Sequence, residues 1–296
     1  MVWRSDGVSW RDGAPRLRWA GAGGRASALR YGRELGFRVV GGERRCSGAR
    51  GHACPTAAAV PARGTGGRCG ECARLDRAHS VAADTFADDP RPYRVYLAWF
   101  GPGLVKVGIT GEERGSARLL EQGAVAFAWL GRGPLMAARR TEEVLRHALA
   151  VPDRIPYARK RAVRFALPPA GERARELAEL HARAAGVPAW AETLQALPCE
   201  VHDHAEAFAL GALQDSPAAQ VVTELVPDGV VAGRLVAAAG PDLHLLDAEA
   251  RPLVLDTRLL TGWELAAAPA GHPVTVPTAT AAAPGDEDAG AQALLF

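Results

Sequence analysis

The chain has 296 residues, of which 48% are hydrophobic and 23% charged, and its formal net charge is +2. This length allows two or three domains of about 100–150 residues, and the small net charge excludes a broad polybasic surface while allowing a local basic stripe. No run approaches the ~18 apolar residues of a membrane-spanning helix, and the N-terminus lacks the apolar core of a signal peptide. We therefore expect a cytoplasmic protein.

The choice of basic residue is skewed, because Lys106 and Lys160 are the only lysines and the chain has no asparagine. Arg and Ala codons are GC-rich, whereas Lys and Asn codons are not. The abundance of arginine thus indicates a codon bias and is not by itself a sign of nucleic-acid binding.

The N-terminal residues 1–45 mix short apolar runs with turns, which predicts an N-terminal β segment. Residues 46–80 follow, rich in Gly, Ala and Arg with almost no large aliphatic side chains, so they cannot form a core of their own. An interaction other than a hydrophobic core must therefore hold residues 46–80 in a fixed structure.

Four of the five cysteines lie in that segment: Cys46, Cys54, Cys69 and Cys72. Cys69-Gly70-Glu71-Cys72 has the spacing of a zinc knuckle, and Cys46 with Cys54 would complete a structural Zn²⁺ site; His52 is an alternative ligand. A redox dithiol is the other interpretation of this spacing, but no helix pattern begins at Cys72 to lower its pKa. Without the metal the segment should be unfolded. Cys199, far away, is expected to be a small buried hydrophobic residue.

After a linker at 81–92, residues 91–165 carry the clearest pattern. Two strands at 94–100 and 104–110 are joined by a Gly-Pro-Gly turn, and a helix at about 112–122 ends at Gly123. A third strand at 125–130 and a helix from Pro134 to about 149 complete a ββαβα order.

Residues 170–268 are expected to form an amphipathic helix at 171–185 followed by a small β-rich domain with short strands between 221 and 265. Continuous pairing between this domain and the strand at 104–110 is not expected. The tail 269–296 is predicted to be disordered. The fold class is therefore α+β.

The central pattern resembles a known family. Arg94-Val95-Tyr96, followed after nine residues by Lys106-Val107-Gly108-Ile109-Thr110, is similar to the paired tripeptides of the GIY-YIG nucleases. The cysteines ahead of LVKVGIT and the later LLEQGA also resemble an uncharacterised prokaryotic family of unknown function. The resemblance implies a GIY-YIG-like ββαβα module that follows the cysteine zinc site.

The resemblance also implies roles for single residues. Tyr96 would orient or deprotonate the attacking water, with Lys106 as the cation that lowers its pKa. Arg118, or Arg114 on the same helix face, would hold the phosphate. Glu142, on the apolar stripe of the second helix, or Glu143 would bind Mg²⁺; Glu143 could instead form an exposed pair with Arg139 or Arg140.

A basic run lies just beyond these positions. Its members are Arg154, Arg159, Lys160, Arg161 and Arg164, with Tyr157 among them, and they would suit a nucleic-acid groove or form a solvated face. His202-Asp203-His204 lacks a fourth metal ligand.

Several functions stay open. The first is metal-dependent phosphodiester hydrolysis of DNA or structured RNA. The second is a zinc-stabilised nucleic-acid-binding adaptor without catalysis, suggested because Arg94 replaces the family's glycine and Lys106 its second tyrosine. Tyr96, Arg118 and Glu142 or Glu143 are expected to open onto one cleft, and a third possible function is recognition of a protein or a small ligand through this cleft.

Overall fold

A computed structural model describes residues 2–20, 25–78, 89–152, 154–188, 190–214, 216 and 218–281. The chain divides into two compact units, Met1–Thr85 with Ser216–Ala281 (the β unit) and Phe86–Asp215 (the αβ unit). Strands and helices both occur, so the α+β class is confirmed. In the part of the chain that the structure describes, no helix is both long and apolar enough to cross a membrane.

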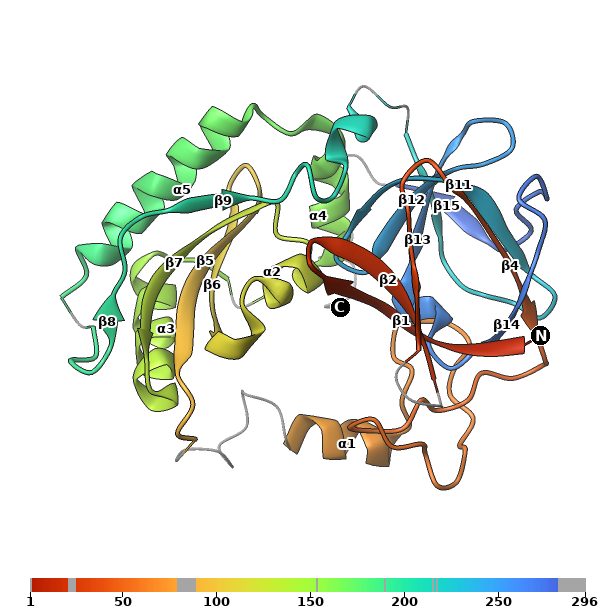
Figure 1. The fold of residues 1–296 in the computed structure, drawn as a ribbon, viewed down its shortest axis with the longest axis horizontal. Helices are drawn as coiled ribbons and strands as arrows, with labels where there is room; N and C mark the ends of the chain where they lie inside the picture. Colours follow the sequence, from red (N-terminus) through yellow and green to blue (C-terminus); the bar gives the residue numbers. More distant parts are fainter. Residues whose placement is uncertain are drawn as a thin grey trace, which may run out of the picture. The chain divides into compact units, whose positions relative to one another are not determined.

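The β unit is built on one sheet that joins strands from residues 2–40 with strands from residues 220–280 (Figure 1). Its elements are β1 (Val2–Arg11), β2 (Ala14–Trp19), β3 (Ala26–Ala28), β4 (Glu34–Val40), α1 (Gly70–Ala78), β10 (Gln220–Val222), β11 (Val230–Ala239), β12 (Asp242–Leu246), β13 (Pro252–Asp256), β14 (Glu264–Ala267) and β15 (Thr278–Thr280). Within the described residues the strand order is β15-β10-β13-β12-β11-β4-β14-β1-β2-β3.

The N-terminal and C-terminal strands, which sequence analysis assigned to separate segments, thus share one sheet. β4 pairs antiparallel with both β11 and β14, and β1 pairs with β14. One face of the sheet is apolar, and neither the N-terminal strands nor the C-terminal strands could cover it alone. Val39, Leu235 and Leu265, from the two ends of the sequence, are accordingly all buried.

The predicted disordered tail is also corrected in part. Residues 278–280 form β15, which pairs antiparallel with β10, and Val276 is buried. The remainder of that prediction, 282–296, lies outside the described residues, as do residues 79–88 of the expected linker.

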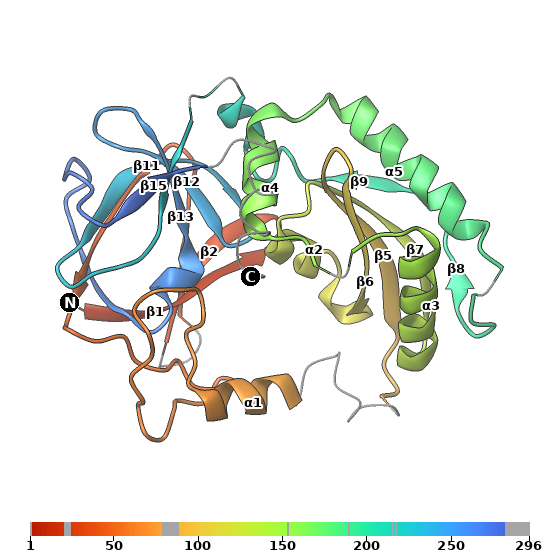
Figure 2. The ribbon, with the colours of Figure 1, turned by 180° about the vertical axis from the view of Figure 1, so that it is seen from behind.

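The αβ unit contains the predicted ββαβα order (Figure 2). Its elements are β5 (Tyr93–Gly101), β6 (Leu104–Gly111), a 3₁₀ turn (Glu112–Arg114), α2 (Ala117–Gln122), β7 (Ala126–Gly133), α3 (Leu135–Ala148), α4 (Tyr157–Val163), α5 (Ala170–Ala185), β8 (Gln195–Ala196) and β9 (Val201–Asp203). In the described part of this unit the strand order is β6-β5-β7-β8, and β9 also pairs with β7. β6 therefore pairs with none of β11 to β13, as expected.

Local sequence explains the ends of these elements. Gly123 ends α2 in the left-handed conformation with φ 71°, where a side chain would be strained. Pro134 precedes α3 in an extended conformation that suits the first turn. The two faces of the sheet are covered differently. Tyr96, Ala98 and Phe100 pack with Leu119 of α2, whereas the Trp99 indole donates 2.7 Å to Glu176 of α5.

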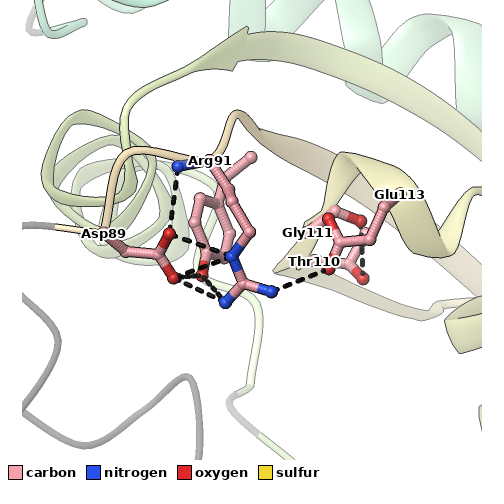
Figure 3. Close-up of polar contacts among 6 residues, drawn as sticks. Asp89, Arg91, Thr110, Gly111 and Glu113 are labelled. Carbon is pink, nitrogen blue, oxygen red and sulfur yellow. Dashed lines mark hydrogen bonds and ion pairs between the residues drawn. The ribbon is translucent and has the colours of Figure 1, made fainter.

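An ion-pair clamp fixes the start of β5 (Figure 3). The Arg91 guanidinium binds the Asp89 carboxylate at 2.6 Å and Glu113 at 3.3 Å. The Tyr93 hydroxyl donates 2.8 Å to the same aspartate. Hydrogen bonds from Arg91 hold the pKa of Asp89 well below its usual range.

Candidate functional site

The four predicted cysteines of the β unit converge. The Sγ atoms of Cys46, Cys54, Cys69 and Cys72, here called the cysteine cluster, all lie within 4.8 Å of one another. A tetrahedral Zn²⁺ with Zn–S bonds of ~2.3 Å would place them about 3.8 Å apart. The cluster is slightly wider than that, and it could hold a metal ion such as zinc.

Two backbone amides donate to one of the four sulfurs. The amides of Gly48 and Cys69 donate to Cys46 Sγ at 3.4 and 3.2 Å. Such N–H···S bonds orient thiolate ligands and offset their charge. Gly48 has φ +82°, and a Cβ at this position would lie 1.9 Å from the His52 carbonyl oxygen, so any side chain there would clash. His52 itself is exposed and is not part of the cluster.

The thiols differ in their tendency to ionise. Hydrogen bonding from Thr56 lowers the pKa of Cys54 to about 6, while burial raises the pKa of Cys72 to about 12. Four close thiols cannot all ionise without a cation between them. A bound dication would lower the pKa of all four thiols, since thiols that coordinate a metal ion are deprotonated.

One expectation about this segment was wrong. Helix α1 begins at Gly70, inside the Cys69–Cys72 knuckle, although no helix was predicted there. Charged and small side chains follow the knuckle glycine, with Leu75 as the one large aliphatic residue of the helix, so the sequence shows no apolar period there. The N-terminus of a helix stabilises a thiolate, so the absence of a helix can no longer be used against a redox dithiol. The metal interpretation depends instead on the positions of Cys46 and Cys54, whose sulfurs lie close to those of Cys69 and Cys72.

Arg44 ties the segment to the sheet. Its side chain is only 1% exposed, and it donates to four carbonyls, those of Pro61, Gly64, Arg258 and Thr261, at 2.7–3.0 Å. The guanidinium thereby joins the loop before the knuckle to the chain before β14. Its planar fork supplies donors in several directions at once, which no other side chain offers.

A groove of about 1020 Å³ opens beside the cysteine cluster. Five arginines line it, against two aspartates, Asp6 and Asp76; we call it the arginine groove, and its arginines are Arg4, Arg18, Arg25, Arg50 and Arg68. The aspartates pair with Arg18 and Arg68, and Arg4 pairs with Glu264, which does not line the groove. The lining therefore carries a positive excess next to the cysteines.

Sequence analysis missed this groove. Its arginines are spread from position 4 to position 68, and the codon bias toward arginine hides any local cluster. The indole of Trp19, interleaved among them, was the available signal.

In the αβ unit, the prediction that the Tyr96 hydroxyl opens onto a surface was wrong. The side chain is 2% exposed, and its hydroxyl accepts a 2.8 Å bond from Gln122 Nε2. Tyr96 lies opposite Gly108 in the strand pair, and its phenol ring occupies the space where a Cβ at Gly108 would stand. Gly108 of the second motif thus provides the space that the Tyr96 ring of the first motif fills.

Glu142, Arg118 and Arg114, three of the other predicted residues, act electrostatically on the Tyr96 hydroxyl. Burial raises the pKa of Tyr96, Glu142 raises it further, and Arg118 and Arg114 oppose the change. A buried tyrosine with a raised pKa is a poor base at neutral pH. Lys106 lies two positions from Gly108 on β6 and is half-buried.

The remaining predicted residues of α2 and α3 are engaged as follows. Arg114 binds Glu121 at 2.7 Å, and Arg118 lies 3.8 Å from the same carboxylate. Glu142 is half-buried on α3. Glu143 is exposed and pairs with Arg146 and His147, rather than with Arg139 or Arg140.

Arg94, which replaces the family's glycine, forms a network of its own. It binds Glu112 at 2.8 Å and lies over the Trp129 ring at 5.0 Å. Glu112 also binds Arg132 at 2.7 Å. These two arginines lower the pKa of Glu112.

The predicted basic run does not form one surface. Lys160 is 4% exposed, donates 3.1 Å to the Gln122 carbonyl and lies over the Phe100 ring, and Arg164 is fully buried. Long basic side chains bury their stems readily when their heads find partners. Arg154 and Arg159 are exposed and Arg161 is half-buried.

Two smaller expectations can also be compared. His202 stacks on Phe127 at 4.7 Å, and His204 Nδ1 lies 3.0 Å from the Ala124 carbonyl, which accounts for both rings as packing groups. Among the described residues the cysteine cluster alone forms a potential metal-binding group of three or more ligands. Cys199 is exposed, so its predicted burial was wrong: it lies in the connection between β8 and β9, outside the packed core.

Comparison with known proteins identifies the family of the chain. A family model described as "Protein of unknown function (DUF2797)" matches residues 32–265. The matched region contains the cysteine cluster, the αβ unit and β10 to β13. No curated protein and no solved structure matches the chain.

Proposed function

Because the chain belongs to the family of proteins of unknown function DUF2797, we propose its function from the site itself: a zinc-stabilised protein that binds nucleic acid through the arginine groove. The single observation that carries this proposal is the groove of about 1020 Å³, lined by five arginines beside the cysteine cluster. Guanidinium groups bind phosphate oxygens bidentately, and they are the usual source of affinity for a polyanion.

Zinc fits the cluster by donor chemistry, since four cysteine sulfurs are the ligand set of a structural zinc site and two backbone amides already donate to one of them, Cys46 Sγ. The metal would hold the loop that carries Arg50 and the chain that carries Arg68. Both belong to a segment with hardly any apolar core of its own. Binding would then depend on the metal through folding and without any chemical step.

The test is salt-dependent binding of a labelled oligonucleotide, followed by fluorescence anisotropy. Replacing Arg25 and Arg50 together by alanine should weaken binding. Each lost phosphate contact should reduce the slope of log K against log salt by about 0.7 for a single strand, so by about 1.4 for both. A matched control replaces Arg11 and Arg38, exposed arginines of the same unit that do not line the groove.

Equal loss in both double variants would mean that total charge, and not the groove, accounts for binding. No binding by the wild-type chain at low salt would remove the proposal. Zinc content and circular dichroism of each variant separate these outcomes from misfolding.

A second candidate is Mg²⁺-dependent phosphodiester hydrolysis by a GIY-YIG-like module in the αβ unit. Its specific support is that Glu142, Arg118 and Arg114 all act electrostatically on Tyr96. Burial of that hydroxyl counts against a role as base, and for this reason binding stands first. Mg²⁺-dependent cleavage lost in Glu142→Gln, and retained in Glu143→Gln, would favour hydrolysis.

A further inference from the structure

A second cavity of the β unit, about 350 Å³, lies next to the arginine groove. Its wall is mostly apolar and aromatic, and we call it the tryptophan cavity; the main wall residues are Trp3, Leu17, Trp19, Phe37, Leu235 and Leu265. The charged residues Arg30, Arg33 and Glu34 also line it. The volume falls near the lower end of the range for small-molecule sites, about 300–1,000 Å³. The wall residues come from β1, β2, β4, β11 and β14, so the sheet itself shapes the cavity.

Ring contacts and a hydrogen bond orient the two indoles of this wall. Their ring centroids are 6.1 Å apart at 45°, and Trp19 Nε1 donates 2.9 Å to Ser27 Oγ. The Arg25 guanidinium lies 5.0 Å from the Trp3 ring centroid. Both indoles are half-buried. Large aromatic side chains that are oriented but only partly covered are typical of ligand-stacking surfaces.

The tryptophan cavity and the arginine groove share one wall residue. Trp19 lines both, and Arg25 lines the groove while it lies over Trp3. A ligand that spans them must therefore carry negative charge on one part and a flat apolar group on another. A nucleotide of a polynucleotide chain has this combination, with its phosphate and its base separated by the sugar.

We propose that the tryptophan cavity receives an unstacked base of a single-stranded nucleic acid whose phosphates lie in the arginine groove. This inference rests on the proposed nucleic-acid binding and adds the class of substrate. The bases of a duplex are stacked and paired inside the helix, so they cannot enter the cavity without being flipped out. The cavity is selective for a base, whereas the groove recognises only charge.

The experiment compares four ligands of equal length by anisotropy with the full zinc-loaded chain: oligo(dT), oligo(U), an abasic deoxyribose-phosphate strand, and a duplex. Stacking of one base is worth a factor of about 10–100 in affinity. Wild-type protein should bind oligo(dT) or oligo(U) more tightly than the abasic strand by that factor. The difference between DNA and RNA arms identifies the sugar that the site prefers.

Variants assign the effect to the cavity. Trp19→Leu keeps apolar volume but removes the aromatic face, so the ratio of the affinities for the base-containing and the abasic strand should fall to about one. Trp19→Phe should restore most of the preference. The control is Trp190→Leu, a half-buried tryptophan of the αβ unit whose indole donates to the Ala184 carbonyl. Quenching of wild-type tryptophan fluorescence by oligo(dT), but not by the abasic strand, is a second readout that needs no variant.

The outcomes separate the two proposals. Equal affinity for base-containing and abasic strands, or equal affinity for duplex, would overturn the base site and leave phosphate binding intact. A preference that survives in Trp19→Leu would place the base elsewhere and also overturn it. Binding of none of the four ligands would refute the proposed function itself.

Discussion

Arg44 offers the sharpest test of how the metal-binding segment is held. Replacing it by methionine keeps much of the apolar stem but removes every donor. Four carbonyls that now receive a guanidinium hydrogen bond, at 2.7–3.0 Å, would lose it inside the protein. Burial lowers the pKa of Arg44, and the four carbonyls are what compensates the buried charge.

The magnitude follows from these bonds. Hydrogen bonds to a charged group contribute about 1.5–3 kcal/mol each, although they do not add fully. A buried carbonyl left without a donor costs about 1–3 kcal/mol, and because the four losses do not add fully, we expect Arg44→Met to lower the free energy of unfolding of the β unit by about 3–5 kcal/mol. Arg44→Lys has only three donors from one atom and should recover part of the loss.

The assay is urea unfolding followed by tryptophan fluorescence, with zinc release to a chelator measured in parallel. The control is Arg45→Ala, because the neighbouring arginine is partly exposed and pairs with Glu43, an interaction worth about 0–1 kcal/mol. If Arg44→Met changed stability by less than about 1 kcal/mol and zinc release were unchanged, Arg44 would not be the tie between the two segments.

Three further predictions concern the metal, the motif glycine and acid stability. Purified protein should contain about one zinc per chain, and Cys72→Ser should lose it while Cys199→Ser keeps it, as metal analysis would show. Gly108→Ala should destabilise the αβ unit by about 1–3 kcal/mol in thermal unfolding, because the new methyl group would overlap the fixed Tyr96 ring. The pKa of Asp89 is lower in the folded protein than its ordinary value of about 3.9. Its stabilising contribution is therefore complete above about pH 3.9 and is lost as the pH falls through the folded pKa. Below about pH 3.9 the melting temperature should fall with decreasing pH, and it should fall less steeply in Asp89→Asn.

Each has a contrasting outcome. Zinc retained by Cys72→Ser would exclude it as a ligand. Gly171→Ala serves as the matched control for Gly108, since no atom lies within 4 Å of a Cβ there, and equal destabilisation of both would refute the packing argument. An identical acid profile in Asp89→Asn would mean that the clamp with Arg91 does not contribute to acid sensitivity.

Sequence alone predicted what depends on short-range pattern or on specific chemistry. The ββαβα order follows from strand runs, turn glycines and helix ends that lie within a few residues of one another. The cysteine cluster followed from the knuckle at Cys69 and Cys72, since few other roles use that spacing outside a disulfide framework.

What failed depends on distant partners. Pairing of β1 with β14 joins residues about 260 positions apart, and no local period encodes it. The same applies to single side chains. Tyr96 and Lys160 stand in patterns typical of an active site and of a basic surface, but Gln122 and Phe100 supply partners that make burial favourable. Only the packed chain reveals those partners.

The central claim, that a metal-ordered β unit binds nucleic acid by charge, is tested most directly by one titration. Affinity of the full chain for an oligonucleotide is measured across a salt series, before and after removal of zinc by a chelator. We expect affinity that falls linearly in log K against log salt, and loss of that binding when zinc removal unfolds the segment that carries Arg50 and Arg68. Binding that is absent at low salt, or that persists unchanged without zinc, would contradict the account.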